Sequence, residues 1–153
     1  LVDLARNDVG KIANYGTVQV PEYMEVKEFS HVQHIVSKVT GSLDKEKTAI
    51  DALSALFPAG TVSGAPKLRA MELIDELEGS RRGPYAGAVG YLSFTGDLDS
   101  CITIRSLFTH GDQISLRAGA GIVADSDPHK EWEEINHKLG ALREALSTRG
   151  EDR

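Results

Sequence analysis

Apolar residues recur every three to four positions in four stretches of the chain, which is the spacing of an amphipathic helix. Helices are therefore predicted at residues 1 to about 11, 44–56, 65–78 and 128 to about 146. Pro66 lies in the first turn of the third helix, and Gly79 lies just beyond its end. Asp127 is predicted to cap the last helix, with Pro128 at its first position.

Between these helices the pattern is that of extended chain. Residues 17–43 are rich in β-branched side chains, which favour strands, among them Val32, Ile35, Val36 and Val39. Three successive strands, antiparallel to one another, are predicted at 84–94, 100–110 and 113–124. Because the strands are grouped rather than alternating with helices, the order predicts an α+β fold with a largely antiparallel sheet and packed helices. Turns are predicted at 14–16 and 57–64, and a frayed tail at 149–153.

The composition indicates one globular domain with a hydrophobic core. The chain has 153 residues, of which 41% are hydrophobic and 26% charged. The net charge is −6, and Lys and Arg are dispersed, which argues against a nucleic-acid partner. No apolar run approaches the length of a membrane span, and no signal-peptide pattern is present, so no membrane association is expected.

Two further features place the chain in context. The single cysteine, Cys101, excludes an internal disulfide and fits a reducing cytosol, and it is predicted to be a packed core residue. The sequence begins with Leu1 inside a helical pattern that has no capping residue before it. We therefore expect a cytoplasmic fragment of a longer protein.

Three charged residues of the last helix can carry chemistry. Glu131, Glu134 and Lys138 stand at i, i+3 and i+7 and so share one helical face. Two carboxylates with a nearby cation can hold a hard divalent metal beside an anionic substrate, although a solvated charged face has the same pattern. The Gly119-Ala120-Gly121 turn before the helix lets backbone N–H groups approach a ligand closely.

An arginine and a tyrosine form a second candidate. Arg105 interrupts the apolar run CITI-R-SL, so either a protein carboxylate or a ligand is expected to meet it. Its planar fork suits a bidentate carboxylate. Tyr85, predicted on the preceding strand, can donate a hydroxyl hydrogen to the same anion or can simply be a half-buried aromatic.

The remaining candidates are less specific. His34 is interpreted either as a core histidine or as a proton-transfer group, and in a strand it would lie on the opposite face from His31. The segment FPAGTVSGAPK is a glycine-rich loop before a helix, which can bind an anion or serve as a plain turn and cap. It is not a nucleotide P-loop, because Gly60 and Gly64 enclose three residues rather than four and Pro66 precedes Lys67.

Together these segments resemble the chorismate-utilising enzymes. The matching stretches are LVDLARNDVGK, VQHIVSKVTG, FPAGTVSGAPKLRAMELIDELE, RGPYAGAVGYLSF, DSCITIRSL and RAGAGIVADSDPHKEWEEINHKLGAL, in family order over nearly the whole chain. The spelling of FPAGTVSGAPK is more similar to the anthranilate synthase branch than to the aminodeoxychorismate synthase branch. The resemblance implies that residues 1–153 are the C-terminal part of the family's chorismate-binding catalytic domain, a partial α/β sandwich, with the N-terminal part absent.

The resemblance also implies a reaction and its partners. In the anthranilate branch, ammonia supplied by a glutamine amidotransferase subunit adds to chorismate, pyruvate is lost, and Mg²⁺ binds the ring carboxylate. The alternatives are aminodeoxychorismate synthase, a salicylate or isochorismate synthase, and, outside the enzymes, a non-catalytic assembly module. The fragment alone is expected to be inactive and to expose apolar surface that favours self-association into a homo-oligomer.

Ten residues acquire roles from this resemblance. Glu134 and Glu131 are implied metal ligands. Tyr85 and Arg105 would hold the enolpyruvyl carboxylate, and Lys138 would neutralise charge of the substrate or of the carboxylates around the metal. Gly119, Ala120 and Gly121 would offer backbone contacts to the substrate. His34 is implied in the elimination step, and Thr61 corresponds to a threonine of the catalytic pocket.

Overall fold

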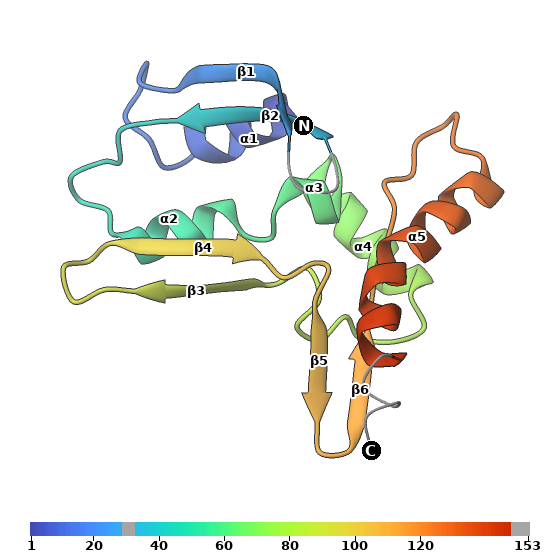
Figure 1. Cartoon of the computed structure of the whole chain (residues 1–153). Helices are drawn as coiled ribbons and strands as arrows, with labels where there is room; N and C mark the ends of the chain where they lie inside the picture. Colours follow the sequence, from blue (N-terminus) through green and yellow to red (C-terminus); the bar gives the residue numbers. More distant parts are fainter. Residues whose placement is uncertain (29–32, 148–153) are drawn as a thin grey trace. The chain divides into compact units, whose positions relative to one another are not determined.

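The computed structural model describes residues 1–28 and 33–147 of the chain (Figure 1). The chain divides into two compact units. The first unit comprises Leu1–Thr61 and Tyr91–Asp99, and the second comprises Val62–Gly90 and the residues from Ser100 onward. His31, Val32 and the predicted tail at 149–153 lie outside the described residues.

The first unit combines a β-hairpin with two helices. Strands β1 (Gln19–Glu28) and β2 (Gln33–Thr40) pair antiparallel, with Val26 opposite Ile35 and Lys27 opposite His34. Helix α1 (Val2–Gly10) packs against β2 and α2 (Ala49–Leu56). Gly41 permits this close packing, because a Cβ there would lie 2.7 Å from the Cβ of Ala13.

Helix α2 begins later than the sequence pattern predicts. The helix was expected from residue 44, but Thr48 caps it, and residues 44–48 form a turn. The Asp51 amide donates to Thr48 Oγ1 at 3.3 Å, and the Thr48 amide donates to Asp51 Oδ2 at 2.7 Å. This reciprocal capping box satisfies two amide groups at once, so it determines where the helix starts.

A groove of about 1000 Å³ opens in the first unit between α1 and the hairpin. Its lining is mainly aliphatic and includes Val2, Val20, Ile35 and Val39. Tyr23 and Met24 also line the groove and remain more than half exposed, at 64% and 55%. The apolar face of this hairpin is therefore only partly covered by α1.

The second unit contains two longer helices and the remaining strands. Helix α3 (Gly60–Ser63) lies at the boundary between the units and replaces part of the loop expected at 57–64. Helix α4 (Lys67–Leu77) follows, then a β3–β4 hairpin, a β5–β6 hairpin and helix α5 (Pro128–Ser147). Strands β3 (Ala88–Leu92) and β4 (Leu98–Ile102) run in opposite directions (Figure 1), and their hairpin contributes residues to both units. Strands β5 (Leu107–His110) and β6 (Gln113–Leu116) pair antiparallel.

The prediction of a single strand over residues 100–110 is wrong. The structure divides this run into β4 and β5, with a bend at Arg105, whose φ is +50°. The backbone of Thr103 exchanges hydrogen bonds with Ala86 and Gly87, at 2.9 Å each, and this pairing ends before the bend. The left-handed conformation at Arg105 then turns the chain into the second hairpin.

Helices α4 and α5 begin and end within two residues of their predicted limits. Asp127 caps α5, because its Oδ1 accepts the amides of His129 and Lys130 at 3.0 Å each. Pro66, expected in the first turn of α4, instead occupies the N-cap position with an extended backbone. Pro66 therefore precedes the helix rather than forming its first turn.

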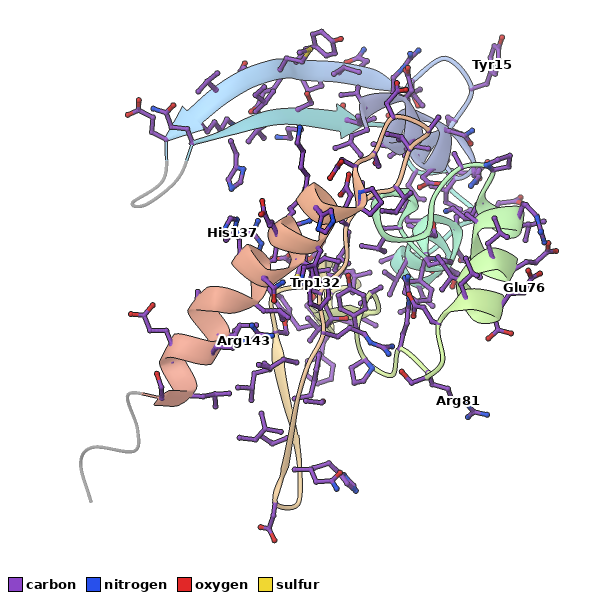
Figure 2. All side chains as sticks on the ribbon, turned by 90° about the vertical axis from the view of Figure 1, so that its right-hand side faces the viewer. Tyr15, Glu76, Arg81, Trp132, His137 and Arg143 are labelled. Atoms are coloured by element: carbon purple, nitrogen blue, oxygen red, sulfur yellow. The ribbon has the colours of Figure 1, made fainter. Side chains whose placement is uncertain are left out.

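Little of the chain is fully buried, which contradicts the expected hydrophobic core. Ala86 is the one hydrophobic side chain with less than a tenth of its surface exposed within the described ranges. Cys101, expected in the core, is exposed. Tyr15 is fully exposed and points away from the first unit, and Trp132 projects from α5 with 63% exposed (Figure 2). The cause is the sheet architecture, since two-stranded sheets offer little apolar cover to one another.

The α+β prediction itself is confirmed. Helices and antiparallel strands occur in the expected order, but within residues 1–28 and 33–147 the strands form three separate two-stranded sheets rather than one. The expected exposure of apolar surface is confirmed as well. None of the helices in the described part of the chain is both long and apolar enough to cross a membrane.

Candidate functional site

Tyr85 lies in a turn before β3 rather than on a strand. Its amide donates to the carbonyl of Arg82 at 3.2 Å, and the Arg82 guanidinium lies over its ring, 5.6 Å from the centroid. Such a cation over the face of an aromatic ring is attractive and restrains the ring. The position of Tyr85 therefore depends on Arg82 through both backbone and side chain.

The hydroxyl of Tyr85 is directed at Gly119. A Cβ added to Gly119 would lie 2.9 Å from the Tyr85 hydroxyl oxygen, closer than side chains normally approach. A side chain at this position would therefore displace the tyrosine hydroxyl, although the backbone of Gly119 is not left-handed. Gly119 and Ala120 are partly buried, and Gly121 is exposed, in the irregular segment between β6 and α5.

Lys138 connects this segment to α5. Its Nζ donates to the carbonyl oxygen of Gly119 at 3.0 Å and also forms an ion pair with Glu134 one turn earlier. The hydrogen bond and charge of Lys138 lower the pKa of the Glu134 carboxyl. The structure thus brings Tyr85, Gly119, Lys138 and Glu134 into one continuous series of contacts within the second unit.

Glu131 lies one turn before Glu134 on the same helix, as the spacing predicts. Its carboxylate is partly buried and has no side-chain hydrogen bond or ion pair among the described residues. No cluster of three or more His, Cys, Asp or Glu side chains suited to a metal occurs in the described ranges. Glu131 and Glu134 are the two carboxylates that this face of α5 offers, and Mg²⁺ is commonly held by one or two carboxylates together with water.

Arg105 differs from its sequence-based prediction. Its side chain is exposed at the bend between β4 and β5 rather than buried in a strand. No protein carboxylate or other side-chain partner meets its guanidinium within residues 1–28 and 33–147. Of the two partners expected for it, the protein carboxylate is excluded there, and the guanidinium is accessible to a ligand.

His34 and Thr61 belong to the first unit, whereas the other eight candidates belong to the second. His34 lies on β2 opposite Lys27 and is exposed, so its interpretation as a core histidine is wrong. Thr61 is exposed within the short helix α3. Both side chains are accessible, as groups that handle a substrate must be.

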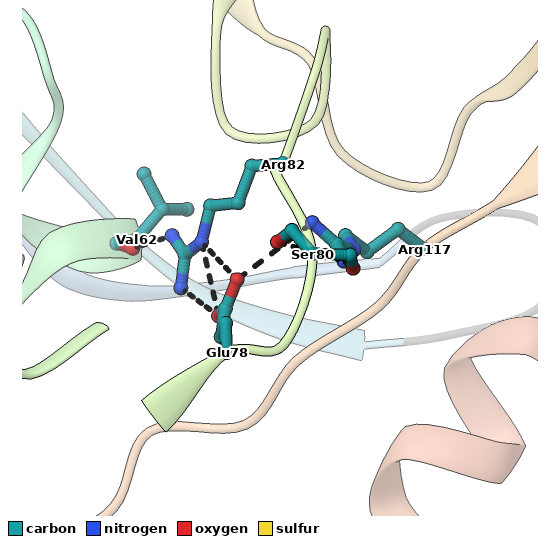
Figure 3. A network of polar contacts seen from close by, with 5 residues as sticks. All are labelled: Val62, Glu78, Ser80, Arg82 and Arg117. Carbon is teal, nitrogen blue, oxygen red and sulfur yellow. Dashed lines mark hydrogen bonds and ion pairs between the residues drawn. The ribbon is translucent and has the colours of Figure 1, made fainter. Parts of the chain in front are cut away.

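One polar network was not anticipated from the sequence (Figure 3). The Glu78 carboxylate accepts three hydrogen bonds from Arg82, of which the shortest joins Nη2 to Oε1 at 2.7 Å. The remaining nitrogen of the same guanidinium donates to the Val62 carbonyl at 2.7 Å. Arg117 Nη1 lies 3.7 Å from Glu78 Oε2, and Arg117 also donates to the hydroxyl of Ser80.

The electrostatics of this network are dominated by Arg82. Its hydrogen bonds lower the pKa of Glu78, with smaller contributions in the same direction from the charges of Arg82 and Arg117. The Nη1 atom of Arg117 is buried and has no hydrogen-bond partner, so the nearby Glu78 charge is its main compensation. A glutamate four residues before an arginine was the one signal available in the sequence.

Similarity to known proteins shows which family the chain belongs to. Residues 1–144 match the family of chorismate binding enzymes. The chain belongs to this family. It is 54% identical over 153 residues to "Anthranilate synthase component 1" of Acetivibrio thermocellus, covering 100% of this chain and 31% of that protein. It is 58% identical over 151 residues to the protein of the same name in Methanothermobacter thermautotrophicus, covering 99% and 32%.

A solved structure leads to the same family. The crystal structure of anthranilate synthase component I from Streptococcus pneumoniae matches the present chain with a TM-score of 0.85 and 54% sequence identity. The match covers 90% of this chain and 32% of that structure. The resemblance inferred from the sequence motifs is therefore confirmed, and the chain spans about a third of the length of the curated relatives it matches.

Proposed function

We propose that this chain is the C-terminal part of the chorismate-binding catalytic domain of an anthranilate synthase large subunit. The observation that supports the proposal most directly is the series of contacts from Tyr85 through Gly119 and Lys138 to Glu134. These contacts join groups suited to a carboxylate with groups suited to a metal. The relatives named anthranilate synthase component 1 cover the whole chain at 54–58% identity, which supports this branch of the family.

The proposed reaction converts chorismate and ammonia into anthranilate and pyruvate. Ammonia forms a bond to ring carbon C2 while the C4 hydroxyl departs as water, and the resulting aminodeoxyisochorismate then loses pyruvate. His34 is assigned the proton transfer that accompanies the loss of pyruvate, because an imidazole can both donate and accept a proton. Thr61 is assigned to the pocket wall.

The substrate carboxylates are assigned to the second unit. The exposed Arg105 guanidinium and the Tyr85 hydroxyl hold the enolpyruvyl carboxylate, which suits the planar fork of arginine. Backbone N–H groups of Gly119, Ala120 and Gly121 contact the substrate. Because Gly119 has no side chain, the Tyr85 hydroxyl and the Gly119 backbone can approach the same ligand atom.

Magnesium is assigned to Glu134 and Glu131. Their two carboxylates on one face of α5 fit the preference of Mg²⁺ for a few oxygen ligands with retained water. When bound, Mg²⁺ supplies positive charge that orients the ring carboxylate. Lys138, now paired with Glu134, is placed to neutralise further charge of the substrate.

The proposal extends to partners and location. Ammonia is supplied by a glutamine amidotransferase subunit, and the enzyme acts in the cytoplasm in tryptophan biosynthesis. The 153 residues by themselves are proposed to be inactive, since two carboxylates are a small ligand set for a catalytic metal. The exposed apolar side chains favour self-association of the isolated chain.

The test is a chimera in which this chain replaces the matching segment of the Acetivibrio thermocellus relative. The folded chimera is given chorismate, Mg²⁺ and ammonium salt, and anthranilate is followed by its fluorescence. We expect anthranilate from the chimera and none from the 153-residue chain alone. Aminodeoxychorismate, isochorismate or salicylate as the product would assign the chain to another branch. A folded chimera that binds neither Mg²⁺ nor chorismate would instead identify an assembly module.

A further inference from the structure

We propose that Glu78 is a positioning residue that fixes the distance between Tyr85 and Gly119, the two groups assigned above to the substrate. This inference rests on the proposed function. Glu78 follows the last residue of α4, and its carboxylate pairs with Arg82 and Arg117 rather than with Tyr85 or Gly119. It acts through two arginines, Arg82 and Arg117, which both face its carboxylate (Figure 3).

The first arm of the network runs through Arg82 to Tyr85. Three hydrogen bonds to Glu78 and one to the Val62 carbonyl fix the plane of the Arg82 guanidinium. That plane lies over the Tyr85 ring, and the Arg82 carbonyl accepts the Tyr85 amide. A guanidinium held by fewer bonds would leave the aromatic ring less restrained.

The second arm runs through Arg117 to Gly119. Arg117 directly follows β6 and stands two residues before Gly119. Its Nη2 reaches the Ser80 hydroxyl and, at 3.5 Å, the Ser80 carbonyl, while its buried Nη1 has only the charge of Glu78 nearby. Loss of that charge would leave the buried Nη1 atom without its compensating carboxylate, so the start of the Gly119 segment would be expected to move.

The two arms meet at one carboxylate. The Tyr85 hydroxyl and Gly119 are separated by less space than a single methyl group needs. A small displacement of either loop therefore changes how the Tyr85 hydroxyl and the Gly119 backbone converge on a substrate carboxylate. Since the bound carboxylate does not react, the contact should stabilise the ground state and the transition state equally, and its loss should appear in KM.

Glu78→Gln in the chimera tests this inference. It keeps the size of the side chain and removes the charge. We expect KM for chorismate to rise about tenfold while kcat stays within about twofold. The matched control is Glu72→Gln on the same helix, because Glu72 pairs with Arg69 at 2.8 Å on an exposed face. Glu72→Gln should change neither constant.

A purely structural role gives a different result. It would lower kcat through a smaller folded fraction and leave KM unchanged, which would overturn the inference. If Glu78→Gln does not fold, Arg82→Lys keeps the charge pair but loses the fork, and it should raise KM in the same way. An unsubstituted chimera that folds but forms no product would contradict both the proposed function and this inference. An unchanged KM in an active chimera would remove the inference alone.

Discussion

Two glutamates of the second unit, Glu78 and Glu134, are each paired with cations and differ in what those pairs can do. Glu78 faces two guanidiniums and is 34% exposed, whereas Glu134 faces one ammonium and is 52% exposed. Hydrogen bonds from the paired cations, and then the charges of those cations, lower the pKa of both carboxyls. A lowered pKa therefore does not distinguish a carboxylate that fixes structure, such as Glu78, from one that can exchange its partner, such as Glu134.

The difference lies in the geometry of the cations. Arg82 holds Glu78 through several parallel hydrogen bonds and has a further bond to Val62, so the pair is rigid. Lys138 is a compact cation on a flexible stem and divides its hydrogen bonds between Glu134 and the Gly119 carbonyl. A metal can displace an ammonium of this kind more readily than it can displace a bidentate guanidinium.

The largest effect is expected from Glu134→Gln, which removes a proposed metal ligand. Anthranilate formation by the chimera should fall at least about 100-fold, more than is typical for loss of a residue that only orients a ligand. The unfolding temperature should change little, because the side chain is largely in water. The measurement pairs the fluorescence assay with a thermal melt, and retained Mg²⁺-dependent turnover would refute the assignment.

Gly119→Ala should produce the next largest effect. The new methyl would lie 2.9 Å from the Tyr85 hydroxyl and would displace it, raising KM for chorismate about tenfold. Gly140→Ala on α5 is the matched control, since no atom outside the helix backbone lies within 4 Å of a Cβ there and the residue has no assigned role in binding. Steady-state kinetics of both variants check this expectation, and equal KM values in the two would contradict it.

Glu78→Gln should have a stability effect that Glu134→Gln lacks. Removing its charge-assisted hydrogen bonds should cost about 1.5–3 kcal/mol of unfolding free energy at neutral pH. The pKa of Glu78 in the folded state is below its ordinary value of 4.5, so its stabilisation is present above that value and is lost as the pH falls through the folded pKa. Urea unfolding at pH 7 and near pH 3 should show the difference between the parent and the variant shrinking in acid. A difference that does not depend on pH would show that the charge is not responsible.

Much of this architecture could be predicted from local sequence signals. Helix α5 forms where the sequence predicts it, because Asp127 caps it as expected. The spacing that places Glu131, Glu134 and Lys138 on one face is also a local property of this helix. The antiparallel pairing of β1 with β2 also follows from a local pattern. These features depend on neighbours in the chain, which are visible in a sequence.

The features that were missed depend on residues far apart in the chain. Arg105 was placed in a strand because its neighbours are apolar, but pairing between Thr103 and Ala86 ends the strand first. Arg117 reaches Ser80 across 37 residues, and no periodicity marks that contact. The expected core failed for a related reason, because composition reports how many apolar residues exist and not whether the strands around them form one sheet.

The smallest effect is expected from Lys138→Met, and its two components have opposite signs. Without the ammonium, the Glu134 carboxylate has no competitor for Mg²⁺. The Mg²⁺ concentration that gives half-maximal activity of the chimera should therefore fall by roughly a few-fold. The substrate loses a cation at the same time, so KM for chorismate should rise, also roughly a few-fold. Titrations of Mg²⁺ at saturating chorismate and of chorismate at saturating Mg²⁺ separate the two. If both values rise, Lys138 supports the metal site rather than competing for it. Glu134 would then not differ from Glu78 in the ease with which its cation is displaced.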